Sequence, residues 1–274
     1  MEAGLAHPVF DPLRPSLREL GNAPPTLDSL NALAGAAQLR VASGKPLRFV
    51  APGGDGRGYE VRIFESGCVP TRPGNPHDLF NALAWLAFPR TKAQLNALHA
   101  AAIPREQGRR GRLRDLLTLF DEGGAVVACD DADLVDMVRG FRWKELFWTN
   151  RAHVLEAMRV HVLGHATLEH ALQPWPGITC KVIFVPGRET PDASAAAWLE
   201  GLSRDATPEL LAALPIFGYP GWFPGNEREA FYDDTRYFRP FRRDKIPAGV
   251  GQAAAGRSKA RTEESPGSAE RDAG

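Results

Sequence analysis

The stretch RVHVLGHATLEHAL places three residues that can bind a metal four positions apart: His161, His165 and Glu169. On a single helix this spacing puts all three side chains on one face. Imidazole and carboxylate groups together suit a divalent cation. Two alternatives stay open. Gly164 could break the helix, with RVHVL as a strand and a helix starting near His165, and a histidine on an apolar face is more often a hydrogen-bonded core residue than a ligand.

A second polar cluster, His77, Asp78 and Asn81, opens the otherwise apolar segment LFNALAWLAF. The Asn-Pro pair just before it supplies a cap and a first helical residue, and predicts a helix over residues 76–88. The His77 ring and the Asp78 carboxylate could bind a metal there. In the structural alternative, Asp78 complements the helix dipole while His77 and Asn81 form hydrogen bonds to a neighbouring loop.

The first hypothesis joins these clusters in one site between the helices expected at 76–88 and 150–172. The catalytic set is then His77, Asp78, His165 and Glu169. The metal ligands are His77, Asp78 and His165. A divalent metal would activate a water molecule and a carboxylate would act as general base, which describes a metal-assisted hydrolase. The two histidines must then lie within about 10 Å of each other, since ligands sit about 2 Å from one metal.

The second hypothesis is a non-catalytic binding protein. Five closely spaced arginines could bind an anion: Arg105, Arg109, Arg110, Arg112 and Arg114. The aromatic loop at 215–226 could form a ligand platform around Trp222. Ligand-binding residues would then include Asn81, Arg109, Arg110 and Trp222. The alternatives are a solvated basic face and a loop that closes the core, and the third hypothesis is that every polar cluster is structural.

Composition excludes several classes. Lys+Arg and Asp+Glu both number 33, so a protein that coats nucleic acid is not expected. The three cysteines are scattered singly, which argues against a disulfide framework or a cysteine zinc site. The chain shows neither a basic start followed by an apolar run nor an apolar stretch of about 18–20 residues. We therefore expect a cytoplasmic protein without membrane insertion, and the oligomeric state stays open.

The pattern of elements favours an α+β fold, helix-rich around a small mixed sheet. Strands are expected at 47–50, 58–64 and 179–185, and a hairpin turn at Asp121-Glu-Gly-Gly124. Residues 1–247 form one predicted domain. Residues 248–274 lack large apolar side chains after Val250, which predicts a disordered tail.

Several long motifs together resemble one family. They are NPHDLFNALAWLAFPRTKAQLNALH, LRDLLTLFDEGGAVVA, FRWKELFW, GHATLEHAL and LPIFGYPGW followed by FYDDTRYFRP. The chain resembles, over about residues 10 to 242, the uncharacterised bacterial family Domain of Unknown Function 3025. The resemblance implies a bacterial one-domain protein and carries no activity over. Its closest correspondence includes His77, Asp78, Asn81, Asp121, His165, Glu169, Asp233 and Asp234.

Overall fold

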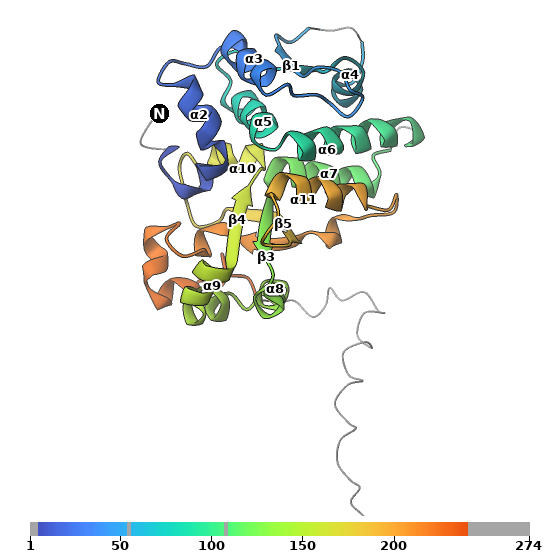
Figure 1. The fold of residues 1–274 in the computed structure, drawn as a ribbon. Helices are drawn as coiled ribbons and strands as arrows, with labels where there is room; N and C mark the ends of the chain where they lie inside the picture. The colour runs from blue at the N-terminus through green and yellow to red at the C-terminus, as the bar shows by residue number, and fades with distance from the viewer. Residues whose placement is uncertain (1–4, 54–55, 107–108, 241–274) are drawn as a thin grey trace, which may run out of the picture. The chain divides into compact units, whose positions relative to one another are not determined.

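The structure is a computed structural model that describes residues 5–53, 56–106 and 109–240. It is helix-rich with two small sheets, which confirms the expected α+β class (Figure 1). The predicted tail at 248–274 lies outside the described residues. None of the helices in the described ranges is long and apolar enough to cross a membrane.

The main sheet has four strands in the order β4-β3-β5-β6. They are β3 (Gly124–Cys129), β4 (Met158–Val162), β5 (Thr179–Val185) and β6 (Ala212–Pro215). The central pair, β3 and β5, is parallel, and the outer strands pair antiparallel. Every residue of β3 is buried, so both faces of the sheet are covered.

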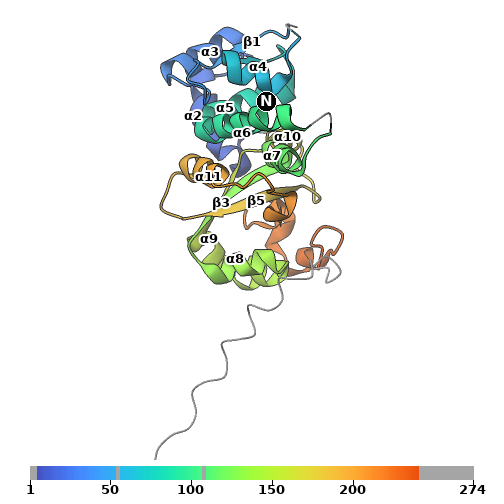
Figure 2. The same ribbon diagram turned by 90° about the vertical axis from the view of Figure 1, so that its right-hand side faces the viewer.

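Helices surround this sheet (Figures 1 and 2). They are α2 (Arg14–Leu20), α3 (Leu27–Ala36), α4 (Tyr59–Ser66), α5 (Pro76–Ala87), α6 (Pro89–Ala102), α7 (Arg112–Gly123), α8 (Ala132–Arg139), α9 (Arg151–Ala157), α10 (His165–His170) and α11 (Pro191–Glu200). A short parallel pair, β1 (Arg48–Val50) and β2 (Cys68–Pro70), flanks α4. Figure 1 shows α8 and α9 at the opposite end of the main sheet from α5, α6 and α7.

The alternation along β3 divides the core. Ala125, Val127 and Cys129 belong to the cluster on one face, whereas Val126 and Ala128 belong to the cluster on the other. Successive strand side chains point to opposite faces, so this period of two follows from strand geometry. Helix α7 packs on the second face and ends directly where β3 begins.

Three local predictions were wrong. Residues 58–64 form α4 rather than a strand, because Gly58 and Gly67 bound a helix of which only Ile63 is fully buried. Asp121-Glu-Gly-Gly124 is no hairpin turn, since Asp121 to Gly123 complete α7 and the chain passes straight into β3. The helix expected over 150–172 divides into α9, β4 and α10. The strand predicted at 179–185 is confirmed as β5.

Candidate metal centre

Two helix starts carry the central side chains. Asn75 caps α5 by accepting a hydrogen bond from the backbone N–H of Asp78, and Pro76 supplies the first helical residue. This places His77 in the first turn of α5. His165 is the first residue of α10, and Glu169 follows one turn later. The helices α5 and α10 pack together, so the polar residues of both meet.

The two histidine rings lie in contact, with centroids 4.6 Å apart. Their Nε2 atoms are 3.1 Å apart. Glu122, from the last turn of α7, joins them: its Oε2 lies 3.2 Å from His165 Nε2 and 3.8 Å from His77 Nε2. A circle through these three atoms has a radius of about 2.0 Å, which matches zinc–ligand distances of about 2.0–2.2 Å. One cation can therefore touch all three.

The position of the proton on His77 leaves its Nε2 free to bind a cation. Glu169 Oε2 lies 3.0 Å from His77 Nδ1. An ionised carboxylate only accepts hydrogen bonds, so His77 carries its proton on Nδ1 and its Nε2 presents a lone pair. That lone pair faces His165 Nε2 and the Glu122 carboxylate.

Both ring nitrogens of His165 face groups that donate electron pairs. Its Nδ1 is buried and has no hydrogen-bond partner among the described residues, and Asp121 Oδ2 lies 3.8 Å away. If His165 carries its proton on Nδ1, the unprotonated Nε2 faces His77 Nε2 and the Glu122 carboxylate, and all three are electron-pair donors. If the proton is on Nε2, the unprotonated Nδ1 faces the Asp121 carboxylate. A cation resolves both conflicts, either as a metal ion bound at Nε2 or as a second proton on the ring.

The environment of each ligand fits a catalytic rather than a closed structural site. The His165 side chain is 5% exposed and forms the floor, whereas those of His77 and Glu122 are 36% and 43% exposed. The hydrogen bond with His165 lowers the pKa of Glu122, which keeps this carboxylate ionised. Three protein ligands leave a fourth position open toward solvent.

Close backbone contact between glycines brings α7 and α10 together. Both Leu163 and Gly164 donate backbone hydrogen bonds to the carbonyl of Gly124, at 3.1 and 2.9 Å. A Cβ on Gly164 would lie only 2.5 Å from the Gly124 nitrogen and 2.7 Å from the Glu122 carbonyl oxygen. Because His165 follows Gly164 and Glu122 lies just before this glycine contact, the same approach sets the distance between the two ligands.

We therefore expect Gly164→Ala to separate Glu122 from His165. The variant should lose about 1–3 kcal/mol of unfolding free energy, since backbone must move to accept the methyl group. Affinity for a divalent metal should fall at least tenfold, measured by titration calorimetry. Gly35→Ala, where a Cβ meets open space within α3, is the matched control and should keep wild-type affinity. Wild-type affinity in Gly164→Ala would refute this account of the spacing.

A buried ion pair lies behind His165. Lys92 on α6 is 4% exposed and pairs with Asp121. Its Nζ also donates to Asn81 Oδ1 at 2.8 Å, and Asn81 donates to the Tyr59 hydroxyl at 2.9 Å. Burial opposes ionisation of Asp121, but Lys92 and His165 outweigh it and lower its pKa. Asp121 therefore presents a negative charge to the ring of His165.

The polar contacts continue between α4 and α6. Asn96 donates to Glu60 Oε2 at 2.7 Å, and the other amide atom of Asn96, Oδ1, is buried without a partner among the described residues. Burial raises the pKa of Glu60 to about 7. A proton on Glu60 would supply the donor that Asn96 Oδ1 lacks, in a paired acid–amide arrangement. Burial also lowers the pKa of the nearby His99 to about 4.

Glu60 should make stability depend on pH. Its folded pKa lies above the ordinary value of 4.5, so its contribution is fully present below pH 4.5 and is lost as the pH rises through 7. Glutamine does not titrate, so Glu60→Gln removes the pH dependence that Glu60 gives to the free energy of unfolding. The stability difference between wild type and Glu60→Gln should grow by about 3 kcal/mol in favour of wild type as the pH falls from 7 to 4.5. Urea unfolding across this range tests it, and a constant difference would contradict it.

Asp78 requires a correction. It was expected as a metal ligand and catalytic residue, but the structure turns it away from the cluster. The Asp78 carboxylate accepts hydrogen bonds from the Arg72 backbone at 2.7 Å and from the Arg72 guanidinium at 2.9 Å. This pairing lowers the pKa of Asp78. The local hydrogen bonds to Arg72 occupy the carboxylate, and Glu122 takes the place expected for it.

The residues expected to bind other ligands are occupied as well. Asn81 is buried between Tyr59 and Lys92. Trp222 is 7% exposed, and its carbonyl oxygen lies 2.5 Å from His7 Nε2, so the loop at 215–226 closes the core instead of offering a platform. His161 lies on β4 opposite Val126, which removes it from the column expected on one helix.

The arginine patch is largely neutralised by ion pairs. Arg110 pairs with Asp115, Arg112 with Glu209 and Arg114 with Glu106. Arg105 and Arg109 remain exposed, and residues 107–108 between them lie outside the described ranges. The carboxylates of Asp115, Glu209 and Glu106 offset most of the positive electrostatic potential that would attract an anion.

Three residues around the cluster were not predicted as site residues: Lys92, Asp121 and Glu122. Asp121 and Glu122 were taken as turn residues, although the helical period of Leu117 and Phe120 continues through them. The buried Lys92 pairs with Asp121, which lies 29 positions along the chain, so no local signal reveals this contact. Continuation of the α7 period was the one local signal that pointed to the acidic pair.

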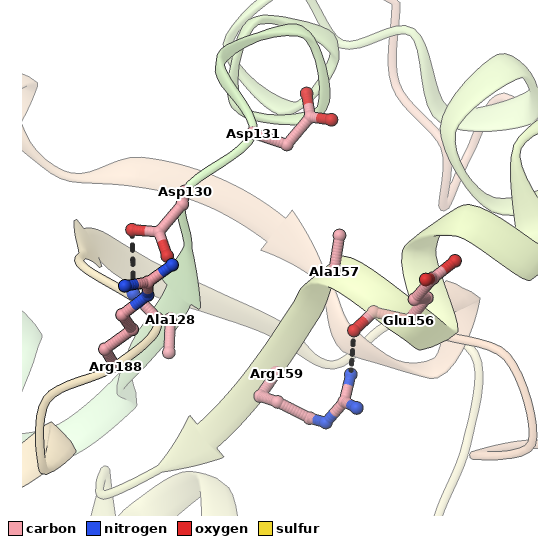
Figure 3. A pocket seen from close by; sticks show the side chains of 8 residues that line it. Ala128, Asp130, Asp131, Glu156, Ala157, Arg159 and Arg188 are labelled. Atoms are coloured by element: carbon pink, nitrogen blue, oxygen red, sulfur yellow. Dashed lines mark hydrogen bonds between the residues drawn. The ribbon is translucent and has the colours of Figure 1, made fainter.

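A separate hollow of about 530 Å³ lies at the far end of β3 (Figure 3). Three of its charged residues have protein partners: Asp130, Asp131 and Arg159. Asp131 accepts from the first turn of α8 and contacts His153, while Asp130 accepts from the backbone of Gly187. Figure 3 shows Arg159 turned to the carbonyl of Glu156. These contacts account for Asp130, Asp131 and Arg159 without a ligand.

Comparison with protein families finds one match. A family model described as "Protein of unknown function (DUF3025)" matches residues 47–242. The match includes α5, α7 and α10, and therefore all three residues of the cluster. Neither the curated proteins nor the solved structures contain a match to this chain.

Proposed function

The chain belongs to the DUF3025 family of proteins of unknown function, and we propose that within it His77, Glu122 and His165 bind a divalent cation for metal-assisted hydrolysis. One observation carries the proposal: His77 Nε2, His165 Nε2 and Glu122 Oε2 lie 3.1–3.8 Å from one another, so a single point lies about 2.0 Å from all three. Two histidines and one carboxylate are the ligand set of hydrolytic zinc sites with an open position.

The neighbouring carboxylates have separate roles in this proposal. Glu169 orients His77 through Nδ1, and Asp121 faces Nδ1 of His165. Carboxylates at these positions fix the tautomer and orientation of histidine ligands. A bound cation would lower the pKa of a coordinated water molecule toward 7. Glu169 lies on the Nδ1 edge of His77, away from the cation position at Nε2, so its proposed role is to orient this ligand, and solvent takes the proton of the attacking water.

The location proposed for this activity is the bacterial cytoplasm, as the composition and the family resemblance suggest. The scattered cysteines support a reducing compartment.

The test is metal-dependent ester hydrolysis. Protein stripped with a chelator should lose activity and regain it on addition of zinc, and Glu122→Gln should prevent the recovery. Glu209→Gln removes an exposed carboxylate that pairs with Arg112 away from both the cluster and the pocket, so its recovery should match that of wild type. Glu169→Gln should lower metal affinity or activity about 10–100-fold, because a neutral amide oxygen holds the His77 Nδ1–H more weakly than a carboxylate does. Equal activity in stripped and reloaded protein would exclude the proposal.

A further inference from the structure

A hollow of about 340 Å³ lies beside the first turn of α5. The segments that enclose it are residues 17–30, the loop at 71–75, α5 and the chain just after α10. Half-buried leucines dominate its wall: Leu5, Leu17, Leu20, Leu27, Leu79 and Leu172. We call this hollow the leucine pocket.

The leucine pocket interrupts otherwise close packing. Leu83 at its floor belongs to the core cluster against the main sheet, and Leu30 belongs to the cluster around β1. Protein interiors normally fill such spaces to the density of organic crystals. Because segments from several parts of the chain enclose it, the space suits an inserted chain better than the flat face of a protein partner. Its volume lies in the range of small-molecule sites.

The pocket lies beside the contact between α5 and α10, and the same contact holds the candidate metal centre. On α5, Pro76 and Leu79 line the pocket, and His77 lies between them. Leu172 follows α10 in a turn, and its backbone N–H donates to the Glu169 carbonyl oxygen at 3.2 Å. The pocket residues Leu79 and Leu172 thus come from the same two segments as His77 and Glu169.

Asp78 helps to fix one wall of the pocket. The loop from Thr71 to Asn75 lines the hollow, and Arg72 within it is bound to Asp78 through backbone and side chain. At the start of this loop, the Thr71 N–H donates to the Val50 carbonyl at 2.7 Å. A loop held at both points gives the pocket a defined shape before any ligand binds.

We propose that the leucine pocket binds the acyl chain of the substrate, so that the hydrolytic site acts on medium-chain acyl esters or amides. This inference rests on the proposed function. A methylene group is about the size of a water molecule, roughly 30 Å³, so the hollow holds about ten carbons. The chain would lie among the leucines with its carbonyl directed toward His77.

The reaction is a hydrolysis without redox change. The water oxygen forms a bond to the acyl carbonyl carbon, and the bond from that carbon to the leaving oxygen or nitrogen breaks. The attacking water loses one proton and the leaving group gains one. The products are a carboxylic acid and an alcohol or amine.

The experiment measures binding of acetate, decanoate and hexadecanoate to the full chain by titration calorimetry. Decanoate should bind at least 30-fold more tightly than acetate, and hexadecanoate should bind more weakly than decanoate because about sixteen carbons exceed the volume. Leu79→Trp fills the pocket and should weaken decanoate binding at least tenfold. Leu172→Trp is a second filling variant from another wall. Leu210→Trp, at a leucine that is 56% exposed and outside the pocket, should bind as wild type does.

Affinity that rises steadily through hexadecanoate, or that is unchanged in both filling variants, would overturn the acyl-pocket inference. Metal content and hydrolysis of decanoyl and acetyl p-nitrophenyl esters are measured on the same preparations. Preference for the decanoyl ester that is lost in Leu79→Trp supports the inference. Decanoate binding without any bound metal would overturn the proposed function but support the pocket as an acyl site.

Discussion

Replacing His165 by alanine is expected to weaken binding of a divalent metal by more than 100-fold. Structural zinc sites bind with about 10–16 kcal/mol across four ligands, so one ligand is worth about 3 kcal/mol. His165 is the buried member of the cluster and lies within 3.2 Å of both other ligand atoms. Titration with Co²⁺, followed by its visible absorption and by calorimetry, measures the loss directly.

The matched control is His153→Ala. His153 also contacts a carboxylate, Asp131, with its Nε2 at 2.7 Å, but it lies on α9 at the other end of the sheet. The His153→Ala variant should bind Co²⁺ with wild-type affinity. If His165→Ala binds Co²⁺ within threefold of wild type, His165 is not a ligand.

Replacing Lys92 by methionine is expected to destabilise the fold by about 3–5 kcal/mol. The change removes the cation from a buried pair and leaves the Asp121 carboxylate without compensation. It also removes the donor to Asn81 Oδ1. Methionine keeps an apolar side chain of similar length beside Trp85, where the Lys92 ammonium lies 5.6 Å from the ring centroid. Urea unfolding gives the free energy.

Two further variants show whether the loss comes from the unpaired charge. Lys92→Met with Asp121→Asn should recover much of the stability, because the double variant buries no charge. Arg112→Met removes the cation of an exposed pair with Glu209 and should cost less than 1 kcal/mol. A loss in Lys92→Met no larger than that in Arg112→Met would show that the buried pair is not important for stability.

Local capping signals made part of the site predictable. The Asn75-Pro76 pair starts α5 where the sequence indicates, and this start places His77. Gly164 separates β4 from α10, as the alternative of a strand followed by a helix near His165 anticipates. Both histidines lie in the first turn of a helix, and packing of α5 against α10 brings their Nε2 atoms within 3.1 Å.

The missing ligand could not be found in the same way. Glu122 reaches the cluster because Gly164 and Gly124 allow two backbone segments to touch, a contact between residues 40 positions apart. A sequence of Asp, Glu and two glycines has the composition of a turn, so local propensity favoured a hairpin. Packing of α7 on the sheet overrode that preference and extended the helix to Gly123.

Asp78 was misplaced for the opposite reason. Its chemistry suited a metal, but a partner six positions earlier, Arg72, binds both of its oxygens. Such a short-range pair depends on the path of the loop at 71–75, which residue types alone do not determine. The same pair now accounts for the shape of the leucine pocket.

The central claim is that His77, Glu122 and His165 hold a divalent cation, and elemental analysis of the purified full chain tests it most directly. We expect about one equivalent of a divalent transition metal per chain in wild type and in Asp78→Ala, and less than a tenth of an equivalent in His77→Ala and Glu122→Ala. Circular dichroism of each variant confirms that the fold is retained. Wild-type protein that stays metal-free after incubation with zinc and dialysis, or His77→Ala that keeps its full equivalent, would contradict the account.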